Sequence, residues 1–195
     1  METKTWATMP PNIIERIIGH AVKRNSYYSY NSNEWPMRVR NYGRVCTTWM
    51  TAVLESRSIF ESNENHFIRI GEPNTSELVR DGFLGVVRGV CLSKNANDSH
   101  LELAWSNFNS ILIEEYKLDL PQNLSLQAFE CLIDMIKTSK KASIFKIEVN
   151  LASQREAQRL WVLMNTVTNC NDLQKEIYIE LKSKCKIDWN FTAAS

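Results

Sequence analysis

The residue types that most often carry catalysis are present in this sequence, but they are not grouped into a recognisable site. The three histidines, His20, His66 and His100, stand apart, and none lies near a cysteine or serine at the spacing of a nucleophile and its base. No two of the five cysteines form a C-x-x-C pair, the usual signature of a zinc site or a redox dithiol. The sequence therefore predicts a protein that is not an enzyme and binds no cofactor or metal, with free thiols at Cys46, Cys91, Cys131, Cys170 and Cys185.

Phosphate binding and acid–base chemistry have no better support in the sequence. The glycines of Gly82–Gly89 are not followed by the Gly-Lys-Ser/Thr of a phosphate-binding loop, and no spacing pairs the carboxylates. The 23 basic and 22 acidic residues leave a net charge of +1, too small to steer the chain to nucleic acid or a membrane. There is no apolar leader and no apolar run of about 20 residues. We therefore expect a cytoplasmic and/or nuclear protein, with neither nucleic acid nor membrane as a partner.

The chemistry that the sequence does favour is apolar contact between helices. Isoleucines 13, 14, 17 and 18 follow Met9-Pro10, and this spacing gives a helix one apolar stripe. We expect the helix to begin near Pro10-Pro11, because proline in the first helical position sacrifices no hydrogen bond, and to fray at Lys23-Arg24. A helix this short cannot hide its stripe alone, so the stripe must be covered by the rest of the chain or by a partner.

A second helix is predicted after a polar, tyrosine-rich loop. It begins at Trp35-Pro36 and runs to Leu54, with Gly43 as an interruption that marks a close neighbour. Its apolar positions recur at steps of three and four and comprise Val39, Tyr42, Val45, Cys46, Trp49, Met50, Val53 and Leu54.

The remainder of the chain alternates between two periodicities. Strands are predicted at residues 86–92, 112–120, 145–151 and 176–181, and helices between them at 99–108, 125–138 and 153–167. The strand-helix unit recurs at roughly 30 residues, which is typical of a short β/α solenoid with a small parallel sheet. A small non-repeating α/β domain is the alternative. The fold class expected is α+β to α/β, with a helical module at 1–60, a connector at 61–82 that holds a short strand at 67–70, a β/α domain at 83–185 and a tail at 186–195.

The order of the N-terminal motifs resembles the F-box, the helical module that docks substrate receptors onto the Skp-type adaptor of a cullin-RING (SCF) ubiquitin ligase. Three features depart from the family pattern: Met9 replaces the usual leucine, Thr47 replaces a basic residue, and the loop Asn25–Pro36 is longer, which leaves open how the module's middle helix is built. The resemblance implies an adaptor-binding surface formed by Met9, Pro10, Ile13, Ile14, Ile17, Val45, Cys46 and Trp49.

The β/α units resemble leucine-rich repeats, whose pattern is L-x-x-L-x-L-x-x-N. Val87 to Asn95 matches the whole pattern and Leu118 to Asn123 its second half, whereas Gln154 and Lys184 occupy the asparagine position of the later units. In the family this asparagine bonds buried backbone groups at the turn after the strand, so the resemblance implies that Asn95 and Asn123 do so here.

Alternation along the strands separates an inward face from an exposed face. Tyr116, Leu118, Leu120, Ile147, Val149, Leu151, Ile177, Ile179 and Leu181 are expected to point into the core. The predicted target-binding residues lie on the opposite face: Glu115, Lys117, Lys146, Glu148, Glu176, Tyr178 and Glu180. With Asp119 and Asn150 this face is mildly acidic, which favours a basic target surface. The alternative is a solvated strand face that binds nothing.

Two functional hypotheses follow. In the first, the chain is a substrate receptor that binds the Skp-type adaptor through its N-terminal helices and recruits a protein target through its β/α repeats for ubiquitination, while partner enzymes carry out catalysis. In the second, it is an adaptor-independent binding or scaffolding module that sequesters a partner protein, and the N-terminal helices cap its repeats. An enzyme of unknown type is a third hypothesis that no group of residues supports.

Overall fold

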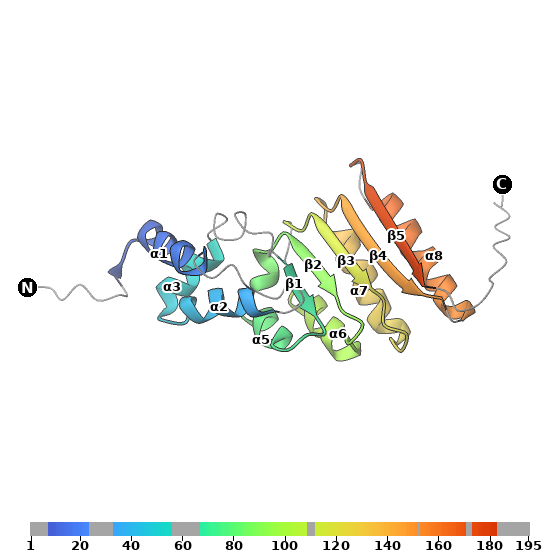
Figure 1. Cartoon of the computed structure of the whole chain (residues 1–195), viewed down its shortest axis with the longest axis horizontal. Coiled ribbons are helices and arrows are strands. Elements are labelled where there is room, and N and C mark those ends of the chain that lie inside the picture. The colour runs from blue at the N-terminus through green and yellow to red at the C-terminus, as the bar shows by residue number, and fades with distance from the viewer. Residues whose placement is uncertain are drawn as a thin grey trace, which may run out of the picture.

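The protein is a mixed α/β structure in which a group of helices is followed by a parallel sheet (Figure 1). A computed structural model describes residues 8–23, 33–55, 67–108, 112–151, 153–170 and 173–182. Within these residues the chain forms seven α-helices, a short 3-10 helix and five strands. None of the described helices has the length and apolarity that crossing a membrane would require.

Three helices form the N-terminal end of the molecule. They are α1 (Pro11–Lys23), α2 (Glu34–Gly43) and α3 (Thr47–Glu55), and α1 packs on the other two. Helix α1 begins as predicted, with Pro11 in its first position and the Pro10 carbonyl accepting from Ile13 and Ile14. The core side of this group contains Ile14, Ile18, Val39, Trp49 and Val53.

The prediction of one helix from Trp35 to Leu54 is wrong, because the chain turns between α2 and α3. Gly43 ends α2, and α3 begins after a short connection at Arg44–Cys46. A Cβ on Gly43 would lie 3.1 Å from the Met50 sulfur. The glycine therefore marks a close neighbour, as expected, but the neighbour is the next helix of the same chain.

The five strands form one sheet in which every strand is parallel to its neighbours. The strands are β1 (Phe67–Ile70), β2 (Gly89–Leu92), β3 (Glu115–Asp119), β4 (Ile144–Asn150) and β5 (Glu176–Lys182), and they lie side by side in sequence order. The predicted connector at 61–82 therefore contributes β1 to the sheet, and also α5 (Thr75–Arg80). A 3-10 helix, η2 (Phe83–Gly85), precedes β2.

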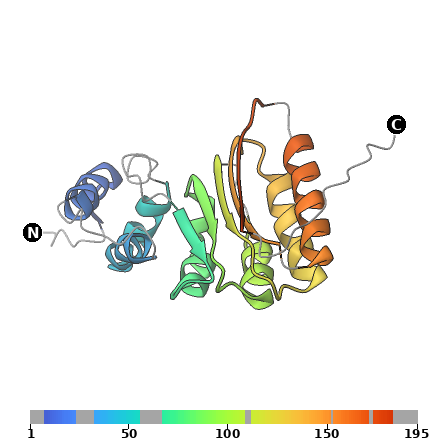
Figure 2. The ribbon, with the colours of Figure 1, turned by 45° about the vertical axis from the view of Figure 1, so that its right-hand side comes forward.

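One face of the sheet is covered by helices, and none of the described helices lies on the other face, which we call the open face (Figure 2). Helices α6 (Asp98–Ser106), α7 (Leu126–Thr138) and α8 (Gln154–Asn169) lie on the same side, as Figure 2 shows. Each begins at a polar cap whose side chain accepts a backbone N–H: Asn97, Ser125 and Ser153. The units are also tied to one another, because Asp98 accepts from the Ser125 N–H and Arg155 donates to the Leu124 carbonyl.

The predicted alternation along the strands is confirmed for the central strands. Tyr116, Leu118, Ile147, Val149 and Leu151 are buried beneath the helices, while Leu120 and Ile177 are partly buried. Ile179, on the edge strand β5, is 43% exposed, and the Leu181 side chain lies outside the described residues.

One further expectation about single residues is wrong. Asn95 and Asn123 are exposed, so they do not bond buried backbone groups as the repeat pattern implies. Trp161 on α8 is 57% exposed, although it follows the buried Leu160. The core side of α8 is instead formed by Leu160, Leu163 and Val167.

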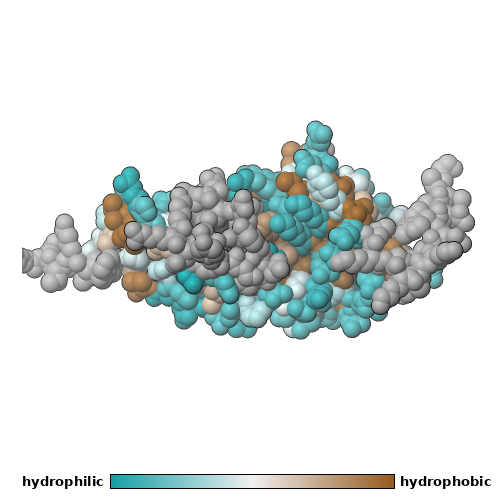
Figure 3. All heavy atoms as spheres, in the orientation of Figure 1, coloured by the Kyte–Doolittle hydropathy of each residue, from teal (hydrophilic) through white to brown (hydrophobic). Residues whose placement is uncertain are grey.

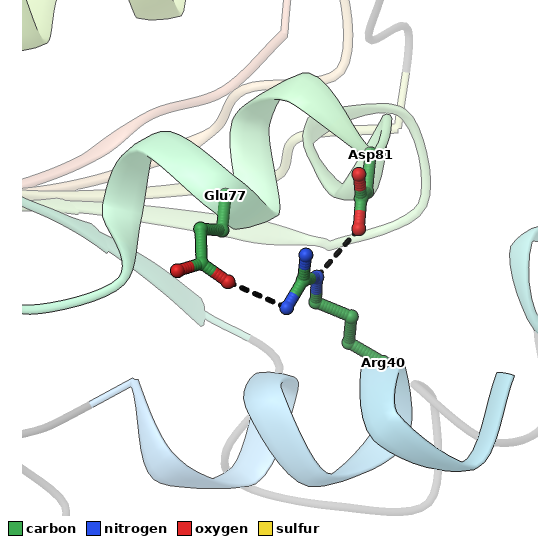
Figure 4. Close-up of polar contacts among 3 residues, drawn as sticks. All are labelled: Arg40, Glu77 and Asp81. Atoms are coloured by element: carbon green, nitrogen blue, oxygen red, sulfur yellow. Dashed lines mark hydrogen bonds and ion pairs between the residues drawn. The ribbon is translucent and has the colours of Figure 1, made fainter. Parts of the chain in front are cut away.

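The N-terminal helices are joined to the sheet by polar contacts that cross between α2 and the β1–α5 segment. The Asn33 side chain, 2% exposed, accepts from the Arg69 N–H and donates to the carbonyls of Arg69 and Pro73. Arg69 lies on the edge strand β1, where no further strand among the described residues pairs with its outward N–H and carbonyl. The Asn33 side-chain amide provides the hydrogen bonds that a neighbouring strand would provide. Seven residues along α2, Arg40 extends to α5 and bonds both Glu77 and Asp81 (Figure 4).

Candidate protein-binding surfaces

The first candidate surface is the outer side of α1. Ile13 and Ile17 are each 38% exposed, although they alternate with the fully buried Ile14 and Ile18. Because the exposed pair is separated by four residues, its side chains lie above one another on one helical face. We call Ile13 and Ile17 the isoleucine face. Figure 3 shows hydrophobic residues at the surface of this end of the molecule.

The structure divides the predicted adaptor-binding residues into exposed and buried groups. Pro10 and Val45 are exposed, the latter by 54%, and Met9 and Cys46 are partly buried against the core. Ile14 and Trp49, at 0% and 4% exposed, are covered by this chain itself. In this arrangement they shape the surface from beneath and are not available to touch a partner, which corrects the predicted contact set.

The second candidate surface is the uncovered face of the sheet. The register of the strands places Arg69, Cys91, Lys117, Lys146 and Tyr178 in one row across all five strands. We call this set the central row. The next row toward the carboxyl ends of the strands carries acids at Asp119, Glu148 and Glu180, and the preceding row carries Glu115 and Glu176.

The cations of the central row are held in place by neighbours on the same face. Lys146 Nζ lies 2.8 Å from Glu115 Oε1, and Lys117 Nζ lies 3.7 Å from the same oxygen. Lys117 also sits 3.9 Å above the centre of the Phe67 ring. The ring lies over Gly89, where a Cβ would come within 2.2 Å of it, so glycine is required for this stacking. Phe67 on β1 and Glu115 on β3 therefore both orient the Lys117 side chain.

These rows surround a shallow groove of about 820 Å³ that crosses the sheet. The groove is lined by the central row together with Asp119, Glu148 and Glu180. In Figure 3, which views this face, hydrophilic residues predominate and hydrophobic residues lie between them. A row of cations beside a row of carboxylates is suited to recognising a polypeptide segment that carries both charges.

Cys91 of β2 lines the groove, and its environment suppresses ionisation of the thiol. Burial raises the pKa of the thiol, and the opposing effect of the nearby Arg69 and Lys117 charges is smaller. Arg69 Nη1 is 3.1 Å from the sulfur. Burial also raises the pKa of Tyr116, whose hydroxyl is 2.5 Å from the Ser139 hydroxyl beneath α7.

We expect the free energy of unfolding to fall as the pH rises above about 8.5. The folded-state pKa values of Cys91 and Tyr116 are raised, so the unfolded chain releases these protons first. Their stabilising contribution is complete below the unfolded-state values, about 8.5 for a thiol and about 10 for a phenol, and is lost above them. Urea unfolding at a series of pH values measures this. Cys91→Ala should reduce the part of the loss that sets in near the thiol value without abolishing it, because burial also raises the pKa of the Cys131 and Cys170 thiols. An unchanged profile in that variant would contradict the assignment.

All seven predicted target-binding residues lie on the open face of the sheet. Five of them, Lys117, Lys146, Glu148, Tyr178 and Glu180, line the groove itself. Glu115 bonds the two lysines, and Glu176 accepts a 3.3 Å bond from the Tyr178 hydroxyl.

Three residues of this face were missed by the sequence reasoning: Arg69, Cys91 and Phe67. The signal for Arg69 was available, because Phe67–Ile70 alternates as a half-buried strand does. Assigning that strand to a connector concealed its place in the sheet.

Among the described residues, no three His, Cys, Asp or Glu side chains are placed to hold a metal ion. Comparison with known proteins found no matching family model, no similar curated protein and no similar solved structure.

Proposed function

We propose that this protein is an F-box-type substrate receptor with an irregular, leucine-rich-repeat-like sheet domain. In this proposal α1–α3 bind a Skp-type adaptor, and the open sheet face holds a protein target for ubiquitination. The chain itself performs no chemistry. By binding both, it holds the target near the ligase and so raises the effective concentration of the target there.

The observation that carries the proposal is the isoleucine face. Ile14 and Ile18 complete the core of the helical group, so Ile13 and Ile17 are not needed there and remain at the surface. Apolar side chains spaced four apart on an exposed helix face suit docking against a partner helix. A separate middle helix, α2, lies between the two halves of the sequence motif, which supports the resemblance.

The joint between the helices and the sheet also supports a receptor. Asn33 and Arg40 tie α2 to β1 and α5 through several bonds. A receptor benefits from such a joint, because proximity is useful only where the two bound proteins keep a fixed geometry. The strand order and the single helical layer support the repeat-like description of the sheet domain.

Adaptor binding can be tested by replacing the two apolar side chains of the isoleucine face with charged ones. The purified chain should co-elute with a Skp-type adaptor in size-exclusion chromatography with light scattering. The double variant Ile13→Asp/Ile17→Asp should weaken binding by roughly a hundredfold, the expected effect of losing hot-spot residues. Since both side chains are already solvent-exposed in part, the variant should retain its helical circular dichroism.

The matched control is Leu126→Asp, which changes an apolar residue that is 66% exposed on α7, away from the helical group. This variant should bind the adaptor as the unchanged chain does. Failure of the folded, unchanged chain to bind would reject the receptor proposal.

A second function is favoured by one observation. Asn33 bonds the outer backbone groups of β1, so the N-terminal helices cover the end of the sheet. This is what a capping element does in a scaffolding or sequestering module that needs no adaptor. Target binding through the sheet face without adaptor binding would be the result in favour of this alternative.

A further inference from the structure

The two edges of the sheet differ in how their backbone is satisfied. At β1 the Asn33 amide bonds the outward N–H and carbonyl of Arg69. At the opposite edge, β5 pairs with β4 along seven residues, and no strand among the described residues pairs with its other side. Strand β5 contains no proline, and it exposes Tyr178 and Ile179 by 55% and 43%. A long edge of this kind is a template for pairing with another strand.

The hydrogen bonds to β4 show which backbone groups are directed outward. The Glu176 N–H donates to the Ser143 carbonyl at 2.8 Å. In a parallel ladder a residue directs its N–H and its C=O to the same side, and successive residues alternate. The backbone groups of Ile177, Ile179 and Leu181 therefore point away from β4.

The sequence of β5 is complementary to itself in the reverse direction. When two copies of Glu176–Lys182 are placed antiparallel about Ile179, Glu176 stands opposite Lys182, Tyr178 opposite Glu180, and Ile177 opposite Leu181. Opposite charges and apolar pairs in these cross-strand positions are stabilising. The outward backbone groups of Ile177, Ile179 and Leu181 then face the same groups of the second strand, as antiparallel bonding requires.

We propose that two copies of this protein associate through β5, antiparallel and with the two-fold axis at Ile179, to form one continuous sheet. Such an interface is isologous, which is the commonest symmetry of protein dimers. The axis is perpendicular to the sheet, so both helical layers lie on the same side and the two α8 helices become neighbours. Helix α8 is the last helix of its layer (Figure 2), and its Trp161 is 57% exposed.

The partner is a second copy because of the charges at the two ends of the strand. A strand that pairs antiparallel with β5 must present a cation opposite Glu176 and an anion opposite Lys182. The same seven residues meet both requirements when reversed. The proposal does not depend on adaptor binding, since the isoleucine face lies at the other end of the molecule (Figure 1).

Sedimentation of the full chain at increasing concentration tests the proposal, and a monomer–dimer equilibrium is the expected result. Ile179→Pro removes the central outward N–H but no bond to β4, and proline is tolerated on the free side of an edge strand. This variant should sediment as a folded monomer. Leu126→Asp, at an exposed site on α7, should leave the dimer intact.

A charge exchange keeps the test decisive even if the proline variant fails to fold. Glu176→Lys places a lysine opposite Lys182 at both ends of the strand pair. This repulsion should raise the dissociation constant of the dimer about tenfold. The double variant Glu176→Lys/Lys182→Glu should restore the original value. An unchanged chain that stays monomeric throughout would overturn the proposal, as would a dimer that ignores both β5 changes. A monomer whose Ile177 and Ile179 amides exchange slowly with deuterium would also overturn it, because another segment of the same chain would then cover the edge.

Discussion

Asn33→Asp should destabilise the protein by about 3 kcal/mol, the largest effect that we expect from any single isosteric change. The introduced carboxyl keeps the acceptor for the Arg69 N–H. It loses the donor that lies 2.9 Å from the Arg69 carbonyl and 3.2 Å from the Pro73 carbonyl. A buried oxygen with negative charge would then face two carbonyl oxygens at a site where Asn33 is 2% exposed.

The pH dependence of this variant identifies the cause. The surrounding carbonyls and the burial should raise the folded-state pKa of the introduced carboxyl above its unfolded value of about 3.9. The folded state then binds a proton more readily than the unfolded chain, and the protonated carboxyl donates as the amide did. The difference in the free energy of unfolding between Asn33→Asp and the unchanged protein should therefore shrink as the pH falls from about 8 to about 5.

Asn33→Ala provides the control, because it removes the hydrogen bonds without adding a charge. Its loss, measured by urea unfolding, should be smaller at pH 8 and should not change with pH. Equal and pH-independent losses in the two variants would contradict the role assigned to the amide.

Arg40→Ala is expected to cost about 2 kcal/mol. The guanidinium side chain is only 7% exposed and spans Glu77 on α5 and Asp81 just after it, with Nη1 2.6 Å from Glu77 and Nε 2.5 Å from Asp81. The loss is smaller than for a fully buried ion pair, because the side chains of Glu77 and Asp81 are 50% and 31% exposed and water can solvate them.

Arg40→Lys separates charge from geometry. A lysine has a point charge and cannot form the two-directional contact, so this variant should lie between the unchanged protein and Arg40→Ala. A double-mutant cycle of Arg40→Ala with Asp81→Ala should give a coupling energy of about 1 kcal/mol. A coupling of zero would show that Arg40 contributes only through the packing of its stem.

Much of the local structure could be predicted from the sequence, since it is set by neighbours along the chain. Period-two segments became strands, and the capping serines Ser125 and Ser153 begin helices. The division of each strand into a buried and an exposed side was also predictable, which is why the seven target-binding positions lie on one face.

What could not be predicted depends on contacts between distant residues. Ile13, Ile14, Ile17 and Ile18 form one stripe in the sequence, but the position of α3 buries only the second member of each pair. The Asn33 amide lies in a segment that looks like an ordinary polar loop, and its partners are 36 to 42 residues away. Arg40 was likewise assigned no role, because nothing local indicates that α5 will bring two carboxylates to it.

The order of the strands has a consequence for how the chain reaches its final form. Every strand pairs with the strands that immediately precede and follow it in the sequence. Each pairing of neighbouring strands joins residues 22 to 32 positions apart in the sequence, so no pairing requires a longer loop to be closed. Because β5 is the last strand in this order, whole strand-helix units could be added or removed at that edge without changing the contacts of α1–α3.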